Sequence, residues 1–315
     1  MDVLSDVIMT MRTGRPHSGR GTRSAPWSRR LTASEGAGFH VVLRGGCRLV
    51  PERGEPVVLG PGDVAFLPHG TAHELTDAPA APAAADGGRH GPETVLLCGA
   101  YLLDRSRAHP LLSELPEVIH LPASPGRGSP LRAAVDLLAS ELEERRAGAD
   151  AAIPALLDTL LISILRTWYD EHADHGWAAA LRDRGISAAL RAIHDDPARG
   201  WTVAELGARA GLSRAAFARR FTALVGRPPL SYLTWWRLTL AARLLTDTDA
   251  PLAAIAKRVG YGSPYAFANA FKREYGLAPG RYRLARSLPA RDGDPVAEAA
   301  GTRLTAAGRR AAVRR

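Results

Sequence analysis

An internal repeat with an offset of 50 residues lies in the C-terminal half of the chain and constrains its fold most. Five residue pairs share this offset: Phe217 and Phe267, Phe221 and Phe271, Gly226 and Gly276, Pro229 and Pro279, and Tyr232 and Tyr282. Self-similarity at a fixed offset marks a structural unit that is used twice. The repeat therefore predicts two copies of one helical motif.

The first copy carries the start and stop signals of two short helices. Thr202 and Glu205 have the spacing of a capping box, which begins a helix. Gly211 ends this helix because glycine lets the backbone turn through positive φ, and Ser213 caps a second helix that runs to about residue 225. This order predicts a helix-turn-helix unit.

The second copy repeats the plan, with a turn at Gly260, a cap at Ser263 and Pro264 at the first helical position. Between the copies, residues 230–245 read as one continuous helix, about 24 Å long at 1.5 Å per residue. Such a helix is a rigid spacer. Two helices held about 34 Å apart can enter successive major grooves on one face of B-DNA.

The charge distribution agrees with a nucleic-acid partner. Residues 181–286 contain 18 Lys or Arg and 7 Asp or Glu, a net charge of +11, whereas the whole chain carries +9. A basic segment of this kind favours polyanions. The chain has no run of 18 apolar residues and no signal-peptide pattern, so we expect a cytoplasmic protein without a membrane partner.

The N-terminal half has a different pattern. From residue 39 to 75, short apolar runs are cut by Gly and Pro, and TVLLCGAYLL follows as a further strand pair after a low-complexity insertion at residues 78–91. These runs predict a small antiparallel barrel or sandwich over about residues 30–122.

Helical periodicity begins after a Pro/Gly/Ser linker at residues 122–130. Two helices are expected, near residues 131–142 and 153–169. The second is apolar over much of its girth, so it packs either on its own β domain or on the same helix of a second subunit. Residues 287–315 lack periodicity and are expected to be a disordered basic tail.

Two segments, WTVAELGARAGLSRAAFARRFTALVGRPPLSYL and IAKRVGYGSPYAFANAFKREYGLAPGRYR, resemble the AraC/XylS family of transcription regulators. GDVAFLPHGTAH resembles the second motif of cupin domains, with Gly62, Pro68, Gly70 and His73 at the motif's spacing. The resemblance implies an α+β protein with a cupin-like β-barrel, a helical linker or dimerisation region and an all-α domain of two helix-turn-helix units. The expected segments are 1–30 (N-terminal), 31–122 (sensor), 123–180 (linker), 181–286 (DNA-binding) and 287–315 (tail).

Family correspondence and helix geometry give the candidate DNA contacts. The residues expected to face bases are Arg214, Ala215, Ala218 and Arg219 in the first copy and Pro264, Tyr265, Ala266 and Asn269 in the second. Arg219 leads this set because Arg can donate two hydrogen bonds to guanine, and Asn269 can read adenine. The residues expected to meet phosphates are Arg237, Lys272, Arg273, Arg281 and Arg283.

The cupin-like half has two sets of candidate sensor residues. His40 and His73 are the candidate metal ligands, but the H-x-H pair of the first cupin motif is absent, so hydrogen-bonded structural roles compete with a metal site. Cys47 and Cys98 are candidate thiol sensors, with small buried apolar residues as the alternative. No cofactor is expected beyond a candidate divalent metal.

The sequence thus predicts a DNA-binding regulator, not an enzyme, whose activity responds to a small molecule or an oxidant. Its candidate partners are double-stranded DNA, a second copy of the chain, the effector and RNA polymerase. One alternative is a metal-dependent cupin enzyme with an accessory DNA-binding domain. Another is an architectural protein that binds all duplexes equally.

Overall fold

The computed structural model describes residues 2–12, 16–34, 36–77, 93–103, 109–123, 129–172 and 176–286, which form two compact units. We name the described residues within Arg15–Leu102 and Pro116–Ile164 the β unit. Those within Met1–Gly14, Leu103–Leu115 and Leu165–Asp292 form the helical unit. Two segments from the N-terminal half thus fold with the C-terminal helices. The insertion predicted at residues 78–91 and the tail predicted at residues 287–315 lie outside the described residues, and the segment boundaries predicted from the sequence remain predictions.

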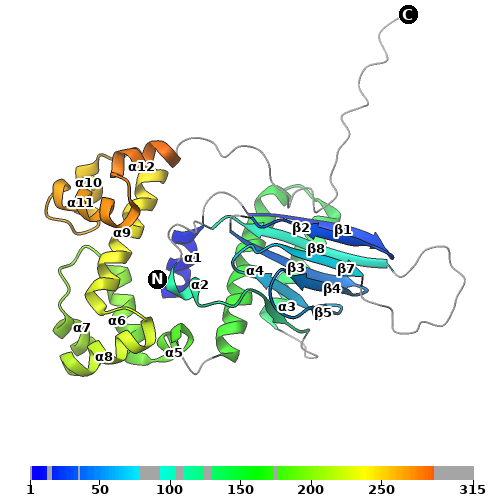
Figure 1. The fold of residues 1–315 in the computed structure, drawn as a ribbon, viewed down its shortest axis with the longest axis horizontal. Coiled ribbons are helices and arrows are strands. Elements are labelled where there is room, and N and C mark those ends of the chain that lie inside the picture. Colours follow the sequence, from blue (N-terminus) through cyan, green and yellow to red (C-terminus); the bar gives the residue numbers. More distant parts are fainter. Residues whose placement is uncertain are drawn as a thin grey trace, which may run out of the picture. The chain divides into compact units, whose positions relative to one another are not determined.

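The β unit contains two antiparallel sheets, with the strand orders β1-β8-β3-β6-β9 and β2-β7-β4-β5 (Figure 1). The strands are β1 His17–Ser24, β2 Ser28–Leu31, β3 Ala37–Arg44, β4 Cys47–Pro51, β5 Val57–Leu59, β6 Val64–Leu67, β7 His73–Asp77, β8 Glu93–Tyr101 and β9 Ile119–Leu121. Apolar side chains from both sheets, such as Val42 and Leu49, are fully buried in one core. This arrangement confirms the predicted cupin-like β architecture.

The strand pair predicted within TVLLCGAYLL is wrong, because this run forms the single strand β8. Gly99 lies within this strand and allows close packing there. A Cβ atom there would lie 2.5 Å from Cε1 of Phe39 and 2.6 Å from the backbone oxygen of His17. Glycine at this position therefore lets β8 approach its neighbours β1 and β3 without turning the chain.

Two long helices follow the strands, as predicted: α3 (Pro130–Glu144) and α4 (Ala149–Glu171). Among the described helices, α4 is long and apolar enough to cross a membrane, with a mean hydropathy of 1.4 over its best window. This is weak evidence for a membrane, because the core helix of a globular domain meets the same criterion. Leu157, Leu160 and Leu161 of α4 are buried, and the hydroxyl of Tyr101 donates to the carbonyl of Leu157 at 2.7 Å.

The helical unit contains both predicted helix-turn-helix units. Its elements are α1 Val3–Met11, α2 Pro110–Ser113, α5 Gly176–Arg182, α6 Arg184–Asp195, α7 Val203–Arg209, α8 Arg214–Val225, α9 Pro229–Asp247, α10 Leu252–Arg258, α11 Pro264–Tyr275 and α12 Pro279–Arg286. Helices α7 and α8 form the first unit, and α10 and α11 form the second. Helix α9 is the predicted spacer, three residues longer than expected, and the two units lie near its opposite ends (Figure 1).

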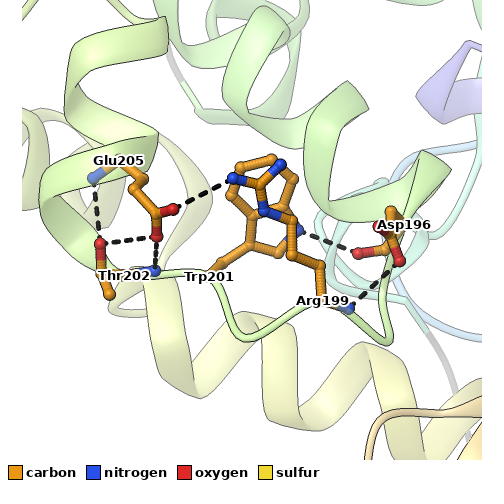
Figure 2. Close-up of polar contacts among 5 residues, drawn as sticks. All are labelled: Asp196, Arg199, Trp201, Thr202 and Glu205. Carbon is orange, nitrogen blue, oxygen red and sulfur yellow. Dashed lines mark hydrogen bonds and ion pairs between the residues drawn. The ribbon is translucent and has the colours of Figure 1, made fainter.

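The local signals for the first unit act as the sequence predicted. The hydroxyl of Thr202 accepts from the backbone N–H of Glu205 at 3.1 Å, and Glu205 accepts from the backbone N–H of Thr202 at 2.8 Å. Figure 2 shows that Arg199 extends this capping box by donating to Glu205 at 3.1 Å. The Arg199 guanidinium also stacks 4.2 Å from the centre of the Trp201 ring. These contacts fix the point at which the chain enters the first unit.

Candidate nucleic-acid interface

Helix α8 presents one polar face to solvent and one aromatic face to the core. Arg214, Ala215 and Arg219 are exposed and Ala218 is half-buried. On the opposite face Phe217 and Phe221 are fully buried, with ring centres 5.4 Å apart. The side chains predicted to face DNA bases thus lie on the accessible side of the helix. Their contact with DNA remains a prediction.

Helix α11 has the same division. The four residues predicted to face bases are all exposed: Pro264, Tyr265, Ala266 and Asn269. Tyr265 is 77% exposed, the highest value among the large apolar side chains that the structure describes, while Phe267 and Phe271 are fully buried. The four α11 residues that are predicted to face bases include one amide and one phenol but no guanidinium, so they offer fewer strong donors for base reading than those of α8 do.

The candidate phosphate contacts divide into two groups. Lys272, Arg273 and Arg281 are exposed and can reach a DNA backbone. Arg283 is half-buried and donates from Nε to the carbonyl of Leu245 at 3.2 Å and from Nη2 to that of Ala250 at 2.6 Å. Arg283 therefore satisfies backbone carbonyls at and just after the C-terminal end of α9.

Arg237 also binds backbone carbonyls. Its guanidinium donates to the carbonyls of Pro197 at 2.5 Å and of Arg199 at 2.8 Å, in the loop that leads into the first unit. Burial lowers the pKa of Arg237 below its usual value. The same side chain lies against the turn of the second unit, since a Cβ added to Gly260 would be 2.9 Å from Nη2. Arg237 therefore connects the two helix-turn-helix units. Its position in an amphipathic helix did not reveal this role.

Trp235 and Trp236 of α9 are buried. Their neighbours Tyr232 and Leu233 are buried too. The spacer is thus covered on this side by the rest of the helical unit. Because the helix is packed along its length, it can transmit a fixed distance between α8 and α11.

In the β unit, His40 of β3 and His73 of β7 face each other with their Nε2 atoms 2.8 Å apart. The Nδ1 atom of His73 lies 2.8 Å from the carbonyl of Thr71, so it carries the proton. His73 Nε2 therefore accepts a hydrogen bond from His40 Nε2. Among the described residues, no group of three His, Cys, Asp or Glu side chains is placed to hold a metal ion. Two imidazoles bonded to each other do not fit a divalent site, which needs at least three protein ligands.

The buried histidine pair predicts that acid weakens the fold. Burial lowers the pKa of both His40 and His73 below 6.5, so the folded protein favours the neutral rings. The unfolded chain takes up these protons near pH 6.5, and the free energy of unfolding should decrease as the pH falls below that value. Urea unfolding of the wild type at a series of pH values from about 7.5 to about 5.5, in steps of about 0.5, measures how the free energy of unfolding depends on pH. A slope that is unchanged in the variant His40→Gln would contradict a role for the pair.

Cys47 and Cys98 lie in the core between the two sheets and are both buried free thiols. Burial raises the pKa of each to about 12, with a smaller contribution from Asp63 at Cys47 and from Cys47 at Cys98. The reactive thiolate is therefore scarce at neutral pH. Both side chains pack as small apolar residues, and their burial limits the access of an oxidant to either thiol.

Comparisons with known proteins agree with this geometry. The profile of a cupin family matches residues 2–170, and the profile of a helix-turn-helix domain matches residues 206–285. The chain is 35% identical to an AraC-like transcription regulator of Streptomyces lividans, over 92% of this chain and 100% of that one. It is 31% identical to RclR of Escherichia coli, described as an RCS-specific HTH-type transcriptional activator, over 78% of this chain and 83% of RclR. Among solved structures, the DNA-binding domain of AdpA in complex with a target DNA is 36% identical over 33% of this chain and 92% of that domain, with a TM-score of 0.31.

Proposed function

We propose that this chain, which belongs to the family of AraC-like transcription regulators, reads a two-part DNA site with α8 and α11 in successive major grooves. The observation that carries the proposal is the joint presentation of two exposed helix faces on one packed spacer, α9. A separation of about 34 Å between recognition helices corresponds to one turn of B-DNA, or about 10 base pairs.

In this proposal α8 and α11 make different contacts with DNA. Arg219, with Arg214 beside it, reads guanine through paired hydrogen bonds in the first half-site, and Ala215 and Ala218 leave room for close approach or contact a thymine methyl group. In the second half-site Asn269 reads adenine, while Pro264, Tyr265 and Ala266 supply shape and apolar contact. Lys272, Arg273 and Arg281 bind phosphates, which adds affinity and salt dependence without sequence information.

Selection from a pool of random duplexes with the full chain tests the proposed function. A sequence-specific regulator enriches a bipartite site whose halves are about 10 base pairs apart. Enrichment of no sequence, with equal affinity for all duplexes, would instead establish an architectural DNA binder. A purified protein with stoichiometric iron, manganese or zinc and a turnover activity would support the enzyme alternative.

We further propose that the β unit receives the signal that regulates DNA binding. A cavity in this unit is lined by Trp27, Arg29, His40 and Cys98, which combine aromatic, cationic and thiol groups. The indole N–H of Trp27 and Nδ1 of His40 are buried without a hydrogen-bond partner in the structure. These groups favour a small molecule with both donor and acceptor atoms over an apolar one, and the cavity, about 20 Å³ in volume, must widen to admit it.

The oxidant version of this signal predicts a specific pattern in two single-thiol variants. Promoter binding is measured for the wild type, Cys47→Ser and Cys98→Ser, with and without hypochlorite or peroxide. If a thiol is the sensor, the oxidant changes the affinity of the wild type and fails to change that of at least one variant. Equal responses in all three proteins would discard the thiol sensor and leave the small-molecule effector.

Three further properties are proposed from the family alone. The protein works in the cytoplasm, without enzymatic activity, and its promoter-bound form acts on RNA polymerase. We also propose a homodimer. The exposed Leu137 of α3, which is 59% accessible, offers apolar surface to a second copy. Light scattering of the purified protein gives its mass in solution and decides between a monomer of 33.6 kDa and a dimer.

A further inference from the structure

Four polar side chains from separate parts of the sequence, three of them buried and one half-buried, form a chain of contacts inside the helical unit. They are Asp6 of α1, His194 of α6, Tyr232 of α9 and His109, the residue that precedes α2. The Tyr232 hydroxyl lies 2.7 Å from Nε2 of His194 and 3.0 Å from Nε2 of His109. Nδ1 of His194 lies 3.3 Å from Oδ2 of Asp6. His109 and Tyr232 are fully buried, and His194 is 7% exposed.

The backbone sets the direction of every hydrogen bond in this chain. The N–H of Leu111 donates to Nδ1 of His109 at 3.0 Å, so His109 carries its proton on Nε2 and donates it to the Tyr232 oxygen. The Tyr232 hydroxyl then donates to Nε2 of His194. This leaves the His194 proton on Nδ1, the atom that faces Asp6. In this arrangement the acceptors on His109, Tyr232 and His194 each have one donor and both imidazoles are neutral, while the contact between His194 Nδ1 and Asp6 is electrostatic.

The electrostatic surroundings favour this neutral arrangement. Burial lowers the pKa of His109, and the nearby His194 and Arg227 lower it further. Burial also lowers the pKa of His194, against the opposing effects of Asp6 and Asp195. Burial has the largest effect on the pKa of both rings and favours their neutral forms, although Asp6 opposes it at His194.

Aromatic rings enclose both histidines. The centre of the His109 ring lies 4.7 Å from that of Trp177 and 5.1 Å from that of Trp235. His194 stacks on Trp236 at 4.1 Å. A hydrogen-bonded chain shielded from water in this way is strong and cooperative, because the loss of one bond leaves its neighbours buried and unsatisfied.

Other contacts fasten the segment at residues 109–115 to the same helices. The hydroxyl of Tyr169 donates to the carbonyl of Leu111 at 2.7 Å. Glu114 accepts from the backbone N–H of Trp177 at 3.1 Å. Helix α1 packs on α6 and α9. Two segments from the half of the chain that the cupin profile covers are therefore anchored beside the first helix-turn-helix unit.

The second unit is built differently at the equivalent positions. The residue 50 positions after His194 is Leu244, and the counterpart of Tyr232 is Tyr282. Tyr282 packs on Phe271 and Tyr275, with ring centres 5.2 and 5.5 Å away. In the first unit, Tyr232 packs on Phe221 of α8 at 5.9 Å and thus links the buried chain to the recognition helix.

We propose that the chain Asp6–His194–Tyr232–His109 is a latch through which α1 and residues 109–115 hold α8 in the position that reads DNA. The proposal rests on the proposed reading of DNA by α8. The latched state is the competent one, because Arg214 and Arg219 are exposed while the latch is closed. Opening the latch loosens the first unit alone. In sequence, the segment at residues 109–115 comes after strand β8, which carries Cys98 of the proposed sensor.

Amide hydrogen exchange on the full chain without DNA tests the latch directly. Tyr232→Phe removes one hydroxyl and breaks two hydrogen bonds, and it should speed exchange in Val3–Met11 and in residues 109–115 by about tenfold or more. Exchange in α10 and α11 should not change. The matched control Tyr282→Phe should leave α1 and residues 109–115 as they are in the wild type. Unchanged exchange of both segments in Tyr232→Phe would overturn the proposal, as would an equal increase throughout the helical unit.

Asp6→Ala provides a second variant that lies outside the helix-turn-helix segment and at the edge of the latch. It should reduce preference for the first half-site, with no effect at the second, and Met9→Ala on the exposed side of α1 should have no effect at either. The double variant Asp6→Ala/Tyr232→Phe should lose little more preference for the first half-site than Tyr232→Phe alone, because both substitutions disrupt the same latch. Additive losses, or full half-site preference in Asp6→Ala, would overturn the latch. A wild type without sequence preference would instead overturn the proposed function, and the exchange experiment would still decide the latch.

Discussion

Arg219→Ala should reduce the preference of the protein for its selected site over a site with a changed first half by about 5- to 150-fold. This range corresponds to the roughly 1–3 kcal/mol of discrimination that a paired Arg–guanine contact provides. Arg219 is exposed on α8, whose opposite face is fixed by the buried rings of Phe217 and Phe221. Fluorescence anisotropy with the two duplexes at one salt concentration gives the ratio of dissociation constants.

The adjacent Arg220 is the matched control for this prediction. Its guanidinium is paired with Asp183 at 2.5 Å, so the side chain is held against the residue that caps the start of α6. Arg220→Ala should therefore leave the preference ratio close to that of the wild type. Asn269→Ala should lower preference at the second half-site, but by less than Arg219→Ala does at the first. The reverse ranking would contradict the unequal roles of the two helices and leave DNA binding itself in place.

Gly260→Ala should destabilise the helical unit by more than about 3 kcal/mol, through backbone strain and steric overlap together. Gly260 has a φ of +82°, and an added Cβ would lie 2.6 Å from the backbone oxygen of Ala198. The clash falls where Arg237 joins the turn of the second unit to the loop before the first. The substitution should thus also weaken binding to the complete two-part site.

Gly211 offers the control, because it makes the corresponding turn in the first unit. Its φ is +68°, but a Cβ there would meet nothing within 4 Å. Gly211→Ala should cost only the strain of a left-handed backbone, about 1–2 kcal/mol. Urea unfolding followed by tryptophan fluorescence reports mainly on the helical unit, which holds every tryptophan except Trp27. Equal destabilisation by the two substitutions would contradict the close contact between the turn at Gly260 and the loop before the first helix-turn-helix unit.

The parts of the fold that were predictable from the sequence depend on local signals. The capping box at Thr202, the turns at Gly211 and Gly260 and the cap at Ser263 act within a few residues, and the structure contains each of them. The repeat further separated buried from exposed positions on α8 and α11, because phenylalanines at helical spacing define the inner face.

The missed features depend on contacts between distant residues or on the backbone alone. Strand β1, with the sequence HSGRGTRS, has no apolar alternation, yet it pairs along its whole length with β8 through backbone hydrogen bonds. His109 and Tyr232 meet across 123 positions of sequence, and no periodic pattern announces such a contact. Arg237 and Arg283 were predicted to contact phosphates, and only the fold shows that their guanidinium groups donate to backbone carbonyls.

The central claim is that two recognition helices on one rigid spacer read two half-sites a fixed distance apart. The most direct test measures the affinity of the full chain for the selected site after insertion of about 5 base pairs, half a turn of B-DNA, between the halves. Because α9 cannot follow the second half to the opposite face of the duplex, affinity should fall to that of a duplex with the first half alone. Affinity that is indifferent to the insertion would contradict the rigid two-helix account.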